Sequence, residues 1–441
     1  MKRIRSAAAV VLAVAALGGC MTDPVTGKSV WGRDASDAEE EQMGEEYRPV
    51  ILQQFSGAYP DAELQSYLGG IVLGMAHKSV RPDLQWTFTV LNDSTPNAFA
   101  VPGGEVFITR GLLWRLDDEA EFAVVMGHEI GHVEHRHSMQ SMGRDSMIGL
   151  LGQLGGKVLG NAQIGSTAAG LLVSRYSRDQ ERESDVRGVH NSYTAGYDPR
   201  RGAEVFRKFL AMKGGGETVM DAWTSSHPLD SERIDNILKL SAETDQRLAG
   251  DAPVEGLRVQ TAQFSELIGK VREAEKVYDR HDAALAAVQK AKASKESIQA
   301  AISEFEACAR ALPGHAYFAN TAGKAHLAVG DAAGAKPWFQ QASDLGQGLL
   351  EPEVALGKIA LAEKRFEEAS ARADRGLAIL PGNYLSNYQR GEALLGEGKQ
   401  ADAQAVFEEV LKSAPQDSAE YAAAAQHLGA GAPAKQKRSK R

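Results

Sequence analysis

A repeat of 34 residues runs through the C-terminal part of the chain and restricts its fold to a stack of similar units. Pro313, Pro381 and Pro415 lie on one 34-residue grid, and Gln347 takes the grid position between the first two. Each grid point is preceded by an alanine twelve residues earlier and, in three of four repeats, by a phenylalanine eight residues earlier: Ala301, Ala335, Ala369 and Ala403, then Phe305, Phe339, Ala373 and Phe407. Twenty-four residues before the last three grid points stands a glycine (Gly323, Gly357 and Gly391), whereas Gln289 takes this place in the first, less regular unit.

This pattern is typical of tetratricopeptide repeats, in which each unit is a pair of antiparallel helices. The small residues let the helices approach closely, and the phenylalanine fills the space between them. About four repeats span residues 282–417, and residues 418–429 predict a capping helix. Cys308 occupies a position where the next repeat has Ala342, so we expect a buried small residue rather than a reactive thiol. Such a stack usually binds a peptide or protein on its concave surface, although a spacer or rigid clamp over the preceding domain is the alternative.

A second motif, His128-Glu129-Ile130-Gly131-His132, follows the apolar run Phe122–Met126 and belongs to a predicted buried helix. Residues four apart lie on one helix face, so both imidazoles can bind one ion. Neutral imidazole suits zinc, and Glu129 can act on the proton of a water at the remaining position. This HExxH signature indicates a zinc peptidase with one Zn²⁺ per chain, and a surface helix with two incidental histidines is the alternative.

A third ligand is expected from the segment 174–185. Glu181 and Asp185 are four residues apart and share a helix face, whereas Glu183 points elsewhere. One carboxylate can bind zinc while the other accepts a hydrogen bond from a ligating imidazole. A charged, solvated helix face is the alternative. His135 and His137 are not expected to bind this ion, because four protein ligands would leave no place for water.

Other parts of the first half predict elements around this site. Residues 86–91 alternate as a strand, and 97–109 predict a hairpin or sheet edge with its turn at the glycines. Such a strand beside the metal can bind substrate backbone, and a purely structural hairpin is equally compatible; the residues concerned are Asn97, Phe99, Pro102, Gly103 and Gly104. His227 precedes a helix-starting proline and either stabilises an oxyanion or closes the fourth zinc position at rest.

The N-terminus predicts export. Three basic residues precede a short apolar run that ends at Leu17-Gly18-Gly19-Cys20, too short to span a membrane. The residues before Cys20 resemble a bacterial lipobox, which implies cleavage and lipidation at Cys20; a plain signal peptide is the alternative. Met21 after the cysteine favours the outer membrane by the same resemblance. Removing residues 1–19 takes three positive charges from a net charge of −9 and leaves about −12, which argues against nucleic acid as a partner. Lipidation of Cys20 leaves Cys308 without a disulfide partner.

Over roughly residues 45–240 the chain resembles the membrane-associated zinc metallopeptidases that include HtpX, the CAAX prenyl endopeptidases and BepA. The ordered motifs that carry the resemblance are Asn97 to Gly104, His128 to His132, Ser177-Arg178 with Glu181 and Asp185, and His227-Pro228 with Arg233. The resemblance implies that His128, His132 and Glu181 bind zinc and that Glu129 is the catalytic acid and base. It further implies that Asp185, coupled to Arg233, is a second catalytic acid or orients a ligand. Ser184 replaces the alanine usual in the family, and its small side chain preserves the helix packing.

We therefore predict a mainly α protein, in which a zincin-like HExxH peptidase domain with a small β-sheet precedes a tetratricopeptide solenoid. The predicted segments are a signal peptide (1–19), a lipidated tether (20–45), the peptidase domain (46–249), a connecting helix (250–281), the repeats (282–429) and a basic tail (430–441). Residues 145–173 are expected to form a lid over the site or a surface resting on the bilayer. With the lipobox-like N-terminus, we predict a zinc-dependent endopeptidase of the periplasm, lipid-anchored to the outer membrane. The resemblance to the BepA-like branch implies that it degrades misfolded or stalled outer-membrane proteins. In that reading the repeats recruit substrates or the assembly machinery. The rival hypothesis is a repeat-based assembly factor or chaperone scaffold whose metal site is in a resting, catalytically inactive state most of the time.

Overall fold

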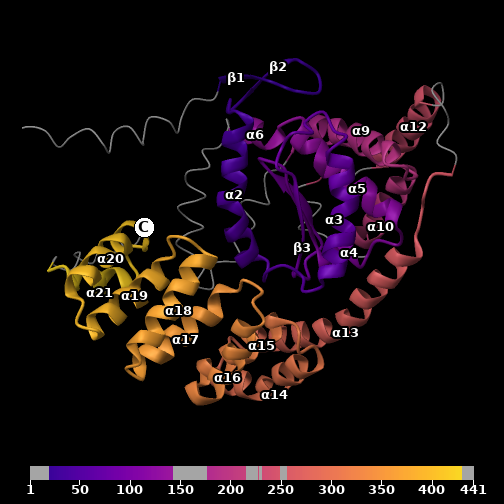
Figure 1. Ribbon diagram of the computed structural model, residues 1–441. Coiled ribbons are helices and arrows are strands. Elements are labelled where there is room, and N and C mark those ends of the chain that lie inside the picture. The colour runs from indigo at the N-terminus through magenta and orange to yellow at the C-terminus, as the bar shows by residue number, and fades with distance from the viewer. Residues whose placement is uncertain (1–18, 143–175, 215–226, 228–230, 249–255, 430–441) are drawn as a thin grey trace, which may run out of the picture. The chain divides into compact units, whose positions relative to one another are not determined.

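The computed structural model describes residues 19–142, 176–214, 227, 231–248 and 256–429 (Figure 1). Of these, residues 19–51, 58–142, 176–214, 227, 231–248 and 256–275 form the first compact unit, and residues 52–57 and 276–429 form the second. The predicted signal peptide up to residue 18, the expected lid at 145–173 and the basic tail lie outside the described residues. Within the described part, no helix combines the length and the apolar character needed to cross a bilayer.

The first unit begins with a small hairpin in the segment expected to be a tether. Strand β1 (Gly19–Thr22) pairs antiparallel with β2 (Ser29–Gly32), and the turn between them is held by the Asp23 carboxylate, which accepts bonds from Val25 N and Thr26 Oγ1. Helix α2 (Asp37–Gln54) follows. Met21 is buried, so this segment packs against the protein rather than being wholly solvated.

The first unit also contains a three-stranded sheet. Strand β5 (Glu105–Thr109) lies in the middle, parallel to β3 (Thr87–Leu91) and antiparallel to β4 (Ala98–Val101). The predicted hairpin is therefore confirmed, and β4 is an edge strand of this sheet. Its turn requires glycine, because Gly103 and Gly104 have φ angles of +85° and +89°.

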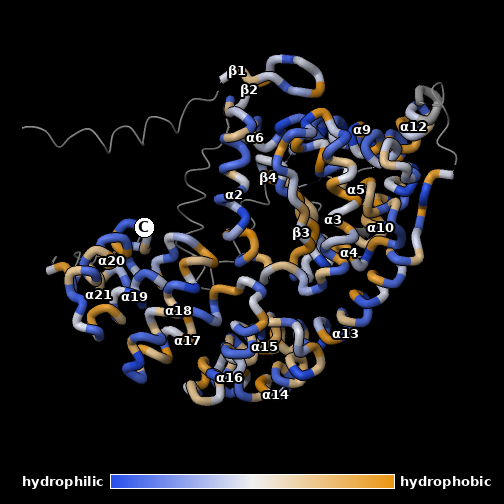
Figure 2. Tube along the Cα trace, viewed as in Figure 1, coloured by the Kyte–Doolittle hydropathy of each residue, from blue (hydrophilic) through white to orange (hydrophobic). Residues whose placement is uncertain are grey.

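Helix α5 (Glu119–Glu134) is the centre of the first unit, and every one of its residues is buried. It packs against α3 (Ala62–Ala76), α9 (Arg178–Thr194), α10 (Arg201–Gly214) and β4 (Figure 1). The short helix α6 (His137–Met142) also contacts α5, α4 (Arg110–Leu113) contacts β5, and α12 (Ser231–Leu248) packs on α9 and α10. In Figure 2 the region of β3 and α10 is mainly orange, whereas much of α2 is blue, as expected for an apolar interior.

Capping residues and glycines explain how α5 and α9 meet. The Asp118 side chain caps α5 by accepting from Glu121 N, and Ser177 begins α9 with a capping box. A Cβ at Gly127 would lie 3.0 Å from the carbonyl oxygen of Gly188, so the two backbones approach more closely than larger residues would allow. Helix α5 ends at Glu134, and Arg136, which adopts a left-handed conformation (φ +56°), separates it from the next helix at His137.

The second unit consists of paired helices. Helix α13 (Ala262–Lys290) leads into it, and the helices that follow are α14 (Lys295–Ala311), α15 (Ala316–Val329), α16 (Ala332–Asp344), α17 (Leu350–Ala362), α18 (Phe366–Ile379), α19 (Tyr384–Gly396), α20 (Gln400–Ser413) and α21 (Ala419–His427). A Cβ at Gly323 would lie 2.9 Å from the Phe339 ring, and Gly391 stands in the same relation to Phe407 at 2.6 Å. The glycine and phenylalanine of the repeat thus pack on each other as predicted. The predicted fold class, mainly helical with small sheets and a series of helical repeats, is confirmed.

Candidate active site

Two elements bring the predicted metal ligands together. His128 and His132 are one turn apart on α5, and their Nε2 atoms lie 3.0 Å apart. Glu181 on the first turn of α9 places Oε2 3.6 Å from His128 Nε2 and Oε1 3.6 Å from His132 Nε2. His227 completes a group of four buried residues whose ligand atoms all lie within 4.8 Å of one another.

The donor set fits a zinc ion. Two atoms that each lie about 2.1 Å from a tetrahedral ion are about 3.4 Å apart, and the three separations among His128, His132 and Glu181 bracket this value. Glu129 also indicates that a water or ion occupies this site, because both of its buried carboxylate oxygens have no hydrogen-bond partner among the described residues. A buried carboxylate without a donor is costly unless a water or ion meets it.

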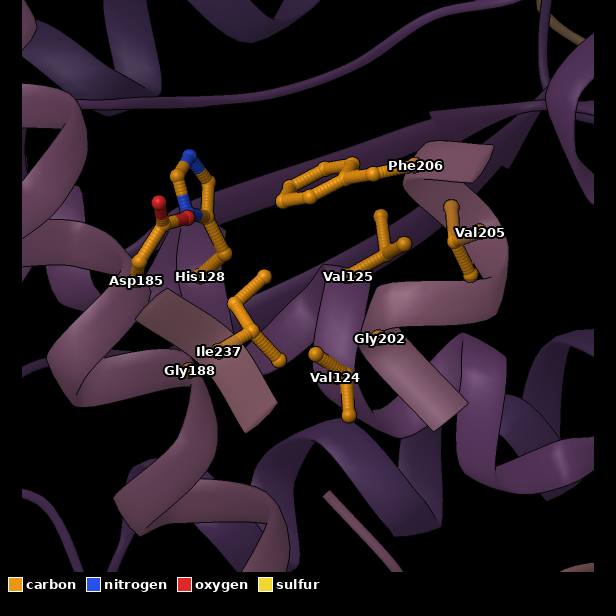
Figure 3. A pocket seen from close by; sticks show the side chains of 9 residues that line it. All are labelled: Val124, Val125, His128, Asp185, Gly188, Gly202, Val205, Phe206 and Ile237. Atoms are coloured by element: carbon orange, nitrogen blue, oxygen red, sulfur yellow. The ribbon is translucent and has the colours of Figure 1, made fainter. Parts of the chain in front are cut away.

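Asp185 contacts the ring nitrogen of His128 that does not face the metal position, and Arg233 in turn contacts Asp185. Asp185 Oδ1 lies 3.0 Å from His128 Nδ1, and Arg233 donates to both Asp185 oxygens, at 2.8 Å from Nε and 2.6 Å from Nη2. Figure 3 shows the Asp185 carboxylate beside one ring nitrogen of His128 while the other nitrogen points away. Asp185 therefore orients His128 so that Nε2 is presented to the ion. The same figure shows apolar side chains beside them, among them Val124, Val125, Phe206 and Ile237. These side chains line a cavity of about 10 Å³.

The sequence reasoning did not identify the groups that hold the second ligand. His132 Nδ1 lies 2.9 Å from His137 Nδ1, and the His132 ring stacks on Tyr176 with centroids 3.8 Å apart. Tyr176 directly precedes the cap of α9, so its position before the Ser177-Arg178 motif was the available signal. No sequence signal predicted the contact between His137 and His132, because this contact depends on the break in the helix at Arg136.

The electrostatic environment prepares these groups for metal binding. Burial lowers the pKa of His132 well below its usual value, and the neighbouring His128 lowers it further, so the ring is neutral. Burial opposes ionisation of Glu181, but the charges of His227 and Arg233 outweigh it and lower the pKa of that carboxyl. Burial raises the pKa of Glu129, only partly offset by His227 and His128. Neutral imidazole and ionised carboxylate are the forms that bind zinc.

Charge also links His227 to this site. Its Nδ1 lies 3.1 Å from Glu181 Oε1 and its Nε2 lies 3.7 Å from Glu129 Oε1. Burial favours the neutral ring, but Glu181 and Glu129 outweigh it and raise the pKa of His227. Arg233 Nη1 also reaches Glu181 Oε2 at 2.7 Å, so His227 and Arg233 both contact a metal ligand.

The remaining predicted residues lie in different settings. Asn97 and Phe99 are at the start of the edge strand β4. Pro102, Gly103 and Gly104 form its turn, where a Cβ at Gly103 would lie 2.5 Å from the Glu40 carbonyl oxygen. Packing on α2 accounts for this turn without any substrate. Cys20 is exposed on β1.

Comparison with known proteins agrees with this geometry. Residues 62–241 match the family model "Peptidase family M48". The mitochondrial metalloendopeptidase OMA1 of Arabidopsis thaliana is 31% identical over 150 residues, which is 34% of this chain and 30% of that protein. OMA1 of Schizosaccharomyces pombe is 27% identical over 223 residues, 48% of this chain and 64% of that protein. The beta-barrel assembly-enhancing protease of Escherichia coli K12 is 29% identical over 219 residues, 46% of this chain and 44% of that protein.

The chain thus spans less than two thirds of the length of each of these relatives. The residues that the family model matches, 62–241, include α5 and α9. The resemblance expected from the motifs is confirmed, and the relatives add OMA1 to the proteins it covers. Residues 62–241 thus match the model of peptidase family M48, and the His-His-Glu group lies within this matched part.

Proposed function

We propose that this chain is a zinc-dependent endopeptidase of the bacterial envelope. One observation carries the proposal: His128, His132 and Glu181 converge on one point, and the Glu129 carboxylate beside them has no hydrogen-bond partner in the described structure. A two-histidine, one-glutamate set leaves a position open for water, as a catalytic rather than structural zinc site requires.

In this mechanism each residue has a distinct role. His128, His132 and Glu181 would hold the zinc ion, which would supply a Lewis acid for the scissile carbonyl and the attacking water. Glu129 takes the proton of that water and later gives it to the leaving amine; its raised pKa brings proton transfer in both directions closer to neutral pH. Asp185 holds His128 in place, and Arg233 holds Asp185.

His227 and β4 complete the proposed site. His227 either donates to the oxyanion that forms during attack or occupies the fourth zinc position at rest, since it contacts both Glu181 and Glu129. The edge strand that contains Phe99 offers backbone groups to an extended substrate, with Asn97 at its start. Because β-strand addition uses backbone atoms, it suits a protease of broad specificity.

The cellular setting of the proposal rests on the N-terminus and the relatives. A lipobox-like sequence at Cys20, with the thiol exposed, supports lipid anchoring in the periplasm and, with Met21, at the outer membrane. One group of relatives is named beta-barrel assembly-enhancing protease. We therefore place misfolded or stalled outer-membrane proteins among the substrates, with the repeats recruiting them or their assembly machinery.

Proteolysis of an unfolded protein tests the chemistry. Mature protein beginning at Cys20 is offered unfolded casein with and without a chelator, and cleavage should stop with the chelator and return with added zinc. Glu129→Gln should reduce the rate about 10²- to 10⁴-fold, the contribution of a general base. Asp179→Asn, a change on the exposed side of α9, is the matched control and should retain full activity. Casein cleavage that persists in the Glu129→Gln protein would contradict the assignment.

The alternative, a repeat-based assembly factor with a resting metal site, is favoured by His227, which belongs to the same four-residue group as the ligands. His227→Ala separates its two roles: activity rises if the ring closes the fourth position and falls if it stabilises an oxyanion. Full-length Glu129→Gln protein then separates the two functions. If it fully restores the envelope of cells that lack the protein, the assembly function is the main one.

A further inference from the structure

A second group of possible metal ligands lies beside the first. His135, His137 and Glu183 bring ligand atoms within 4.8 Å of one another. Both histidines are buried, with 3% and 0% of their surface exposed, whereas the Glu183 side chain is 44% exposed. An ion can therefore reach this group from solvent on the Glu183 side. None of the three residues is a proposed ligand of the first ion, although His137 contacts the ligand His132.

The break after α5 creates this arrangement. His135 and His137 are two residues apart and would point in different directions on a continuous helix. The left-handed conformation of Arg136 (φ +56°) instead brings their rings parallel, with centroids 5.0 Å apart and 3° between planes. The Arg136 guanidinium is engaged by the buried Glu40, so its charge is neutralised. A left-handed conformation is unfavourable for a residue other than glycine and often marks a functional position.

His135 is supported in the same way as a ligand of the first site. Its Nδ1 lies 3.0 Å from Asp23 Oδ2, as His128 Nδ1 lies 3.0 Å from Asp185 Oδ1. Asp23 is itself buried and is held by Val25 N and Thr26 Oγ1 in the turn of the N-terminal hairpin. A carboxylate on one imidazole nitrogen fixes the ring and directs the other nitrogen to an ion.

His137 connects the two groups. Its Nδ1 lies 2.9 Å from His132 Nδ1, and its Nε2 lies 3.1 Å from Glu183 Oε2. Its outward nitrogen therefore faces a carboxylate. Two imidazoles and one carboxylate are a donor set that suits zinc.

We propose that His135, His137 and Glu183 form a second site for a divalent transition-metal ion, Zn²⁺ by its donor chemistry, distinct from the site at His128, His132 and Glu181. The competing explanation is a plain hydrogen bond from His137 to Glu183 with no ion. This inference does not depend on the proposed peptidase activity, because it concerns only how many ions the chain holds.

Zinc stoichiometry tests the proposal. Mature full-length protein carrying Cys20→Ser, which removes an exposed thiol, is stripped with chelator and equilibrated with buffered free Zn²⁺. Bound zinc per chain is measured by inductively coupled plasma mass spectrometry. We expect two ions in this background, one in Glu183→Gln and two in the matched control Asp179→Asn. Asp23→Asn should weaken the second ion about 10- to 100-fold while leaving the first unchanged.

Further variants make the outcomes distinguishable. Glu181→Ala should lose the first ion and keep the second, which shows that the sites are independent even if proteolysis is never observed. His135→Ala should behave as Glu183→Gln, with far-UV circular dichroism confirming that each variant is folded. One ion in the unsubstituted background, or two ions persisting in both Glu183→Gln and His135→Ala, would overturn the proposal.

Discussion

Replacing Asp185 with asparagine tests whether this carboxylate orients a zinc ligand. The substitution keeps the shape of the side chain but removes the charge that His128 Nδ1 and Arg233 face at 3.0 Å and 2.6 Å. Loss of such a partner typically costs 10- to 100-fold in metal affinity. We therefore expect the affinity for the first zinc ion to fall by about 1.4 to 2.7 kcal/mol.

The effect on folding should be smaller than for an isolated buried pair. Breaking a buried ion pair costs about 3–5 kcal/mol when the remaining charge is left alone. Arg233 keeps a second partner, Glu181 Oε2 at 2.7 Å, so we expect a loss nearer the value of one hydrogen bond to a charged group, about 1.5–3 kcal/mol. Asp185→Asn should thus weaken zinc binding in a protein that remains folded at room temperature.

Competition with a chromophoric zinc chelator measures the affinity, and thermal unfolding of the zinc-free protein measures the stability. Asp198→Asn is the matched control, because Asp198 is also buried and paired with an arginine, Arg200 at 2.7 Å, but belongs to neither proposed metal site. It should lower stability and leave zinc affinity unchanged. Our reasoning is refuted if Asp185→Asn binds the first zinc ion within twofold of the unsubstituted protein.

Three other predictions concern ligand choice, repeat packing and the buried thiol. With His135→Ala present to remove the second site, Glu181→Ala should lose the bound zinc ion and Glu183→Ala should retain it; metal analysis that gives the reverse would contradict the helix-face assignment. Gly323→Ala should destabilise the repeats by about 1–3 kcal/mol, since its Cβ would lie 2.9 Å from a phenylalanine ring, whereas Gly269→Ala in α13, with nothing within 4 Å, should be neutral or slightly stabilising in thermal unfolding. Burial raises the pKa of Cys308 to about 11, so the thiolate forms only in strong alkali and alkylation should rise with pH up to that value. At pH 8, with the other cysteine replaced, the native protein should react about 100-fold more slowly than the unfolded chain; equal rates would show an accessible thiol.

Much of the architecture follows from spacing along the chain. His128 and His132 are four residues apart, so helix geometry alone places them on one face, as observed at 3.0 Å. The 34-residue period likewise predicts paired helices that small residues allow to approach closely, and Gly323 lies against the Phe339 ring of the next helix. These predictions hold because they need only local periodicity and the close packing of small with large residues.

Other features required the tertiary structure. The end of α5 at Glu134 has no strong signal in the sequence, because the left-handed conformation of Arg136 depends on buried Glu40, 96 residues away. The contact of His135 with Asp23 joins residues 112 positions apart, and that of His137 with Glu183 joins residues 46 apart. Helical periodicity carries information over a few residues, whereas such pairs depend on how whole elements pack. The sequence by itself therefore determined the residue types of a metal site and the repeat of the helices, and only the packing of α5 against α9 and the N-terminal hairpin decided which side chains support the ligands.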